Sequence, residues 1–226
     1  MLEERIASLK ARLIEYAGLV QDMTEKSIRG LMRKDERLLR EVIEKDEPRA
    51  NAAEIELDGL CTTLVAQYEP KAKDLRTTLM IFKMNSDLER MADHAVNIAE
   101  SGLYLIERPA VKPLLDTPRM AEEVVSMVKD SLQAFVNEDA RLAKAVCGRD
   151  DIVDGLARQI LRELITYMAA DPSTIERALH LLDIAGNLER IADLSTNIGE
   201  DVIFMVEGRV IKHHREEDIQ AAPGKS

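Results

Sequence analysis

The chain repeats Leu88-Glu-Arg-Met-Ala-Asp-His-Ala-Val-Asn-Ile-Ala-Glu100 as Leu188-Glu-Arg-Ile-Ala-Asp-Leu-Ser-Thr-Asn-Ile-Gly-Glu200. The two copies are 100 residues apart (188 − 88) without a gap, and eight of their thirteen positions are identical. Every acid of the segment is among the identical positions, which pair as Glu89 with Glu189, Asp93 with Asp193, and Glu100 with Glu200. An internal repeat indicates one structural unit built twice. Because the acids are kept in both copies, we expect a site that also occurs twice.

Apolar residues around this repeat are spaced as on helices. In the first copy they advance in alternating steps of three and four residues: Ile81, Met84, Leu88, Met91, Ala95, Ile98, Gly102 and Leu105. The second copy has the matching seam: Leu181, Ile184, Leu188, Ile191, Ser195, Ile198, Val202 and Met205. Such steps keep one helix face turned towards its neighbours. Strand-like alternation between hairpin turns is missing, so the sequence predicts an all-α protein.

Prolines and capping residues divide the chain into six predicted helices. Their approximate ranges are 2–32, 35–68, 70–107, 117–146, 147–170 and 171–207. Pro48 falls inside the second helix and should kink or break it. Pro70, Pro118 and Pro172 stand where a first helical turn begins, a position that proline favours. Three prolines within residues 108–118 indicate a linker.

The helix ranges predict two tandem, pseudo-symmetric three-helix bundles. Residues 1–108 form the first bundle and residues 117–208 the second, with residues 109–116 as a Pro-rich linker between them. Residues 209–226 are expected to be a frayed tail. A chain of 226 residues is long enough to bury a sizeable core in this arrangement.

Bulk composition excludes several classes of function. The net charge of −11 argues against general binding to nucleic acid or to anionic lipid, and the absence of Trp removes stacking platforms for bases. No signal-peptide pattern opens the chain, and no apolar run approaches the ~20 residues that cross a bilayer. Cys61 and Cys147 lie in apolar, helix-like stretches and read as buried free thiols. We therefore expect a soluble cytoplasmic protein without direct membrane insertion.

The duplicated acids are the first candidate metal ligands. Glu89 and Asp93 are four residues apart and share one helix face, as do Glu189 and Asp193. Like charges at this spacing destabilise each other unless a proton or a cation intervenes. Carboxylate oxygens favour hard ions such as Mg²⁺, Mn²⁺, Ca²⁺ or iron. The competing interpretation is an ordinary solvated face on which neighbouring arginines neutralise the acids.

Further candidates lie in the second half and along the repeat. Asp150 and Asp154 form another pair four residues apart, near the start of the fifth predicted helix. Their counterpart in the first half is weaker, because Asp46 aligns with Asp150 but Ala50 stands where Asp154 would be. Four further residues are expected to lie next to the metal ligands without binding the metal themselves: Asn97, Asn197, Glu100 and Glu200. We expect the two amides to support ligands or to bond neighbouring helices. We also expect His94 and His180 to be helix-surface residues.

These motifs resemble the PhoU family of phosphate-transport accessory proteins. The resemblance rests on Leu-Glu-Arg-(hydrophobic)-Ala-Asp followed by Asn-Ile-(small)-Glu in both halves, and it extends over residues 2–207. It implies a regulator that holds down phosphate uptake and phosphate-starvation signalling when phosphate is plentiful. It also implies contacts with the ATP-hydrolysing subunit of the phosphate ABC transporter and with a membrane sensor histidine kinase, and it favours a homodimer.

The same resemblance implies multinuclear clusters of iron or other metals on Glu/Asp-x-x-x-Asp motifs. The matching positions are Glu89, Asp93, Glu189, Asp193, Asp150, Asp154 and Asp46. Two positions depart from the family pattern, since Ala50 replaces a common acid and Leu194 replaces a common histidine. These departures count against full occupancy of the cluster that would use Asp46.

Two other classes of function compete with this interpretation. A carboxylate-bridged di-metal oxidase needs Glu-x-x-His motifs, and none of the four histidines has Glu three residues before it. A Gly-rich phosphate loop and a nucleophile elbow are also missing, so we expect no enzyme activity. A structural helical adaptor is the remaining alternative, and it predicts no metal and no phosphate phenotype. The sequence shows no basic anion pocket, so we expect phosphate status to be sensed through a partner complex.

Overall fold

The computed structural model describes residues 2–208, and within that range the secondary structure is entirely helical, which confirms the all-α prediction. The elements are α1 (Leu2–Arg33), α2 (Glu36–Glu41), the π-helical turn η1 (Val42–Asp46), α3 (Glu47–Tyr68), α4 (Lys73–Ile106), α5 (Asp116–Asn137), α6 (Ala140–Cys147), α7 (Asp150–Ala170), the 3₁₀ turn η2 (Pro172–Thr174) and α8 (Ile175–Glu207). The predicted frayed tail, residues 209–226, lies outside the described residues. None of the described helices is long and apolar enough to cross a membrane.

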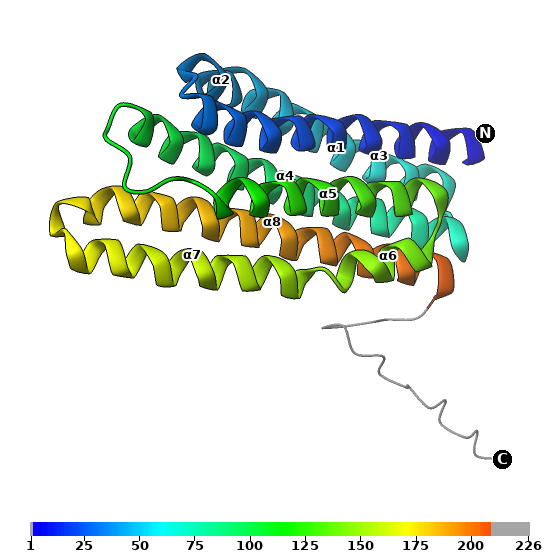
Figure 1. Cartoon of the computed structure of the whole chain (residues 1–226). Helices are drawn as coiled ribbons and strands as arrows, with labels where there is room; N and C mark the ends of the chain where they lie inside the picture. Colours follow the sequence, from blue (N-terminus) through cyan, green and yellow to red (C-terminus); the bar gives the residue numbers. More distant parts are fainter. Residues whose placement is uncertain (1, 209–226) are drawn as a thin grey trace.

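Each half of the chain has the same helix order: one long, one short and two long helices. Helices α1, α3 and α4 pack together in the first half, and α5, α7 and α8 in the second, as two tandem three-helix bundles. The halves meet where α4 packs against α8 and α1 against α5 (Figure 1). Helices α1 and α5 thus cover one side of the α4–α8 pair, while α3 and α7 flank it.

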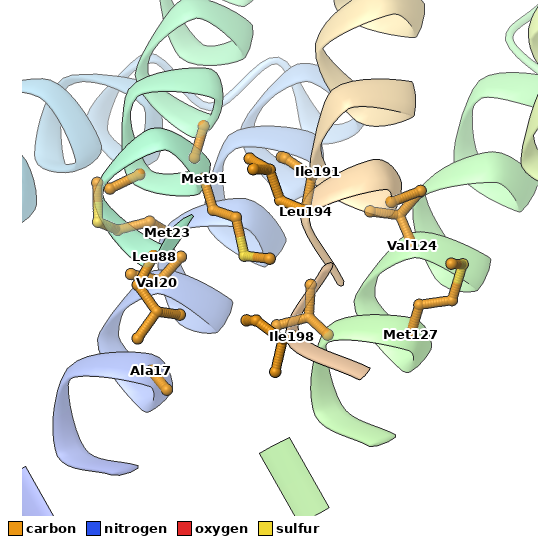
Figure 2. Packing of buried hydrophobic residues seen from close by; sticks show 14 of the residues in the cluster. Ala17, Val20, Met23, Leu88, Met91, Val124, Met127, Ile191, Leu194 and Ile198 are labelled. Atoms are coloured by element: carbon orange, nitrogen blue, oxygen red, sulfur yellow. The ribbon is translucent and has the colours of Figure 1, made fainter. Parts of the chain in front are cut away.

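The core runs through this junction without a gap between the bundles. Figure 2 shows side chains of four helices meeting there: Ala17, Val20 and Met23 of α1, Leu88 and Met91 of α4, Val124 and Met127 of α5, and Ile191, Leu194 and Ile198 of α8. All ten are buried, and they include residues of both predicted seams. The periodicity seen in the sequence therefore marks the faces that hold the two bundles together.

The sequence predicted neither short helix, α2 or α6, as a separate element: it included them in longer helices over 35–68 and 117–146. The sequence predicted a break before Asp35, but it also predicted one helix over 117–146, and the second prediction was wrong: α5 ends at Asn137 and α6 begins at Ala140. Glu138 adopts a left-handed φ of 49°, and the Asp139 side chain accepts hydrogen bonds from the first backbone N–H groups of α6. The left-handed Glu138 therefore ends α5, and the Asp139 N-cap begins α6, as the Asp35 N-cap begins α2.

Two prolines act differently from each other. The predicted helix over 35–68 is not broken at Pro48. Instead, the turn directly before α3 is the wider π-helical turn η1. Proline lacks the N–H for the normal i→i−4 bond, and a wider turn accommodates that loss. The prediction that Pro70 begins the next helix was wrong: α4 starts at Lys73. Glu69 and Ala72 have positive φ angles of 44° and 48°, so helical dihedrals resume only after them.

Both cysteines are buried free thiols within the described residues, as predicted. Burial raises the pKa of the Cys61 thiol to about 12 and that of Cys147 to about 11, with the negative charges of Asp58 and Glu200 adding to it respectively. A thiol with so high a pKa is an inert packing group.

Candidate functional site

The first acidic site, which we define as Glu54, Glu89 and Asp93, combines two helices. Glu89 and Asp93 lie one turn apart on α4, and Glu54 comes from α3. The pKa of Glu89 is raised by burial, by the negative charges of Asp93 and Glu54, and by a hydrogen bond with Asp93. Burial and the same three carboxylates raise the pKa of the Tyr16 hydroxyl on α1. Three carboxylates therefore repel one another beside a buried phenol.

The second acidic site, which we define as Asp150, Asp154, Glu189 and Asp193, brings together four of the predicted ligands. Asp150 and Asp154 lie in the first turns of α7, whose positive N-terminal dipole favours acids. Glu189 and Asp193 lie one turn apart on α8, against which α7 packs. The pKa of Glu189 is raised by burial and then by the negative charges of Asp154, Asp193 and Asp150.

Asp46 is not part of either acidic site. Its side chain is 2% exposed and forms ion pairs with Lys26 at 2.8 Å and Arg49 at 3.0 Å. Lys26 also pairs with Asp22 at 2.9 Å and Glu41 at 3.0 Å. Burial lowers the pKa of Lys26, but the hydrogen bonds that its ammonium group donates to these three carboxylates raise it above its ordinary range. Asp46 already has two cationic partners, so the residues present there do not fit a metal ligand.

Glu54 is the site residue that sequence reasoning missed. It lies one helical turn after Ala50, the position where the second half has an acid, and Ala50 itself is buried in the core. Asn85 fixes α3 against α4 nearby, because its side-chain amide donates to the backbone oxygen of Glu54 at 3.0 Å and to Asp58 at 2.8 Å. An acid displaced by four residues was the available signal, since it stays on the same helix face.

The four residues predicted to lie beside the metal ligands do not share one environment. The Asn97 side chain donates to Asn187 of α8 at 3.2 Å, which confirms one of its two expected roles, a bond between helices. Glu100 is exposed, and Asn197 and Glu200 are half-buried. The charge of Glu200 raises the pKa of the Cys147 thiol, which places Glu200 near α6.

Both histidines bridge α4 and α8. His94 Nδ1 lies 2.8 Å from the Asn187 side-chain oxygen. The His180 ring stacks on Tyr104 at 3.9 Å, and its Nδ1 lies 3.2 Å from the Ser101 hydroxyl. They border an open hollow of about 680 Å³ lined also by Leu179, Leu182, Asp183 and Arg190. The prediction of plain surface histidines was incomplete, because both are half-buried interhelical contacts. Leu194, the counterpart of His94, is a core residue.

Neither acidic site is a finished coordination sphere. Among residues 2–208, no group of three or more His, Cys, Asp or Glu side chains is placed so that it could hold a metal ion. The donor chemistry of the second site nevertheless fits a hard cation, since four carboxylates converge from two helices and none of its members is a soft ligand. The first site offers three carboxylates.

Comparison with known proteins gives a consistent result over nearly the whole chain. The PhoU domain model matches residues 13–102 and 117–202. The "Phosphate-specific transport system accessory protein PhoU homolog" of Aquifex aeolicus is 41% identical over 212 residues, which cover 94% of this chain and 96% of that protein. The "Phosphate-specific transport system accessory protein PhoU homolog 2" of Thermotoga maritima is 34% identical over 217 residues, covering 96% and 92% of the two chains.

Solved structures with the same fold include two proteins of that name. The crystal structure of PhoU from Pseudomonas aeruginosa matches with a TM-score of 0.89 and 32% identity, covering 92% of this chain and 100% of that chain. The crystal structure of the phosphate transport system regulatory protein PhoU from Streptococcus pneumoniae matches with a TM-score of 0.87 and 27% identity, covering 94% and 100%.

Proposed function

This chain belongs to the PhoU family, and on that premise we propose that it is a phosphate-transport accessory protein that regulates phosphate uptake. The observation that carries this proposal is the match of the PhoU domain to both halves of one chain, with relatives aligned over more than nine-tenths of its length. In this proposal the protein acts in the cytoplasm by binding, without catalysis. It holds down uptake and starvation signalling when phosphate is plentiful.

The proposed partners are the ATP-hydrolysing subunit of the phosphate ABC transporter and a sensor histidine kinase, and the protein forms a homodimer. Its net charge of −11 supports electrostatic recognition of basic partner surfaces. Complementary charge mainly accelerates association and excludes wrong partners. A binding assay between the purified protein and the transporter ATPase tests this part, and no measurable binding would refute it.

A metal ion is the proposed cofactor of the second acidic site. Asp150, Asp154, Glu189 and Asp193 would hold Fe, Mn, Mg or Ca, and the ion would neutralise the three carboxylates whose charges raise the pKa of Glu189. The ion would link α7 to α8 and so stiffen the acidic face of the second bundle. The first acidic site, with one carboxylate fewer, would bind more weakly, and Asp46 would bind none.

Elemental analysis of protein purified without a metal-chelating tag tests this cofactor. We expect bound metal, a lower melting temperature after chelation, and loss of both effects in the double variant Glu189→Gln/Asp193→Asn. Glu122→Gln removes one exposed acid of α5 outside the site and serves as the control, compared with Glu189→Gln alone, which also removes one charge. Melting curves that superimpose with and without chelator would refute the metal and leave the structural adaptor as the better description.

A further inference from the structure

Helices α4 and α8 form an antiparallel pair with an internal two-fold axis. Lys83 of α4 forms an ion pair with Asp201 of α8, and Ser101 of α4 donates to Asp183 of α8 at 3.1 Å. The two contacts are equivalent under the repeat of 100 residues: position 83 corresponds to 183, and position 201 corresponds to 101. The same pair of positions therefore meets twice, with the roles of α4 and α8 exchanged. The axis therefore crosses the pair midway between these two contacts, and each half of the pair presents the same positions.

One side of this pair carries corresponding positions of the two halves, most of them exposed, and three of the five pairs are identical: Leu79 with Leu179, Arg90 with Arg190, and Asp93 with Asp193. We define the outer stripe as Leu79, Phe82, Ser86, Arg90 and Asp93 of α4 with Leu179, Leu182, Gly186, Arg190 and Asp193 of α8. Steps of three and four residues put each set on one helix face. Leu79 is 48% exposed and Leu179 54%, and α1 and α5 cover the opposite side of the pair.

Identical residues at exposed positions of the two halves need a reason other than packing. Buried seam residues repeat because both bundles need the same core. Leu79 and Leu179 contribute little to either core, and a half-exposed leucine is unfavourable in water. Arg90 and Arg190 are also exposed and identical. The stripe is therefore one contact surface displayed twice about a two-fold axis.

We propose that the outer stripe docks a two-fold symmetric protein dimer, with each subunit of that dimer contacting one half of the stripe. A two-fold surface is matched in full only by a partner whose own axis coincides with it. Two linked contacts also strengthen binding by effective concentration. The inference rests on the proposed function, because the ATP-hydrolysing subunits of an ABC transporter act as a pair.

The acids in and beside the outer stripe favour a basic partner over a second copy of this acidic chain as the protein that binds there. The acids Asp183 and Glu176 line the hollow that contains Leu179, while Asp93 and Asp193 lie within the stripe nearer the two-fold axis. A second copy would bring the same acids face to face at a cost in free energy. The fitting partner subunit instead presents an apolar anchor flanked by basic side chains.

The register of the pair sets the spacing that the partner must match. By the pairing of Lys83 with Asp201, Leu179 lies opposite Leu105. Leu79 and Leu179 are therefore about 40 Å apart along the helices at a rise of about 1.5 Å per residue. The anchors of the two partner subunits must stand at about that separation.

The test uses the full-length protein and the transporter's ATP-hydrolysing subunit, kept dimeric with ATP by a hydrolysis-deficient substitution. Native mass spectrometry measures stoichiometry, and biolayer interferometry measures affinity for the wild type, Leu79→Ser, Leu179→Ser and the double variant. Ile14→Ser, on α1 and 40% exposed, is the matched control away from the stripe. Circular dichroism melts verify that each variant is folded.

We expect one chain per two ATPase subunits, an affinity about tenfold weaker for each single variant and about hundredfold weaker for the double variant, and no change for Ile14→Ser. Binding that both leucine variants leave unchanged, or that only one of them weakens, would overturn the two-fold docking while the proposed function stands. Absence of wild-type binding would instead remove the proposed partner. A dimer of the chain itself that both variants dissolve would show that the stripe serves self-association, against this inference.

Discussion

Asp201 should make the protein less stable at neutral pH than at acidic pH. Its side chain lies on α8 against α4 and is 6% exposed. Burial raises its pKa from 3.8 to about 6; the hydrogen bond and charge of Lys83 lower it, and the negative charges of Asp87 and Glu200 raise it. Replacing it in Asp201→Asn removes the buried charge and leaves a neutral group of the same shape.

The size of the effect follows from the difference between the folded and unfolded pKa values. The folded pKa is higher than the unfolded one, so the folded state holds the proton more tightly. The stabilisation of the folded state by protonated Asp201 is fully present below pH 3.8 and is lost as pH rises through 6. At about 1.36 kcal/mol per pKa unit, the loss approaches about 3 kcal/mol at pH 7.5. Asp201→Asn should therefore be more stable than the wild type by about 3 kcal/mol at pH 7.5 and by less than about 1 kcal/mol at pH 4.

Urea unfolding followed by circular dichroism between pH 4 and pH 7.5, in buffers with EDTA, measures this difference. Lys83→Met provides the matched control: it removes the cation beside Asp201, so it should destabilise the wild type at pH 7.5 and have a smaller effect in the Asp201→Asn background, where only the charge of Asp87 still interacts with Lys83. A variant less stable than the wild type at pH 7.5, or a stability gain independent of pH, would contradict the reasoning.

Three further predictions concern packing, ion pairing and thiol reactivity. Gly30→Ala would place a Cβ 2.6 Å from a leucine carbon of α2, so urea unfolding should show a loss of about 1–3 kcal/mol, whereas Gly18→Ala, with open space around it, should gain about 0.5–1 kcal/mol. Asp46→Ala removes one of three carboxylate partners of the half-buried Lys26 and should cost about 1.5–3 kcal/mol in the same assay without lowering metal content; loss of metal would place Asp46 in a metal site after all. Cys61 and Cys147 should react with a disulfide reagent at pH 8 only after unfolding, because burial raises both thiol pKa values, and fast reaction of the native protein would show that they are accessible.

The candidate sites were predictable as far as they depend on one helix. Glu189 and Asp193 share a face because they are one turn apart, and the same spacing joins Asp150 to Asp154. The two pairs approach each other because α7 packs against α8, and that packing is not encoded by either pair's spacing. Asp46 shows the limit most clearly: its alignment suggested a metal ligand, but Lys26, twenty residues away on another helix, neutralises it.

The repeat spacing and the three-and-four periodicity determined, from the sequence alone, a helical protein made of two similar halves, because both signals are local and recur along the chain. Tertiary structure alone decided which charges meet: that Glu54 replaces the acid missing at position 50, that His94 and Asn97 both reach Asn187, and which side of α4 and α8 stays uncovered. Those outcomes depend on how helices from distant parts of the chain dock, and docking is set by the sum of many buried contacts that no single motif contains.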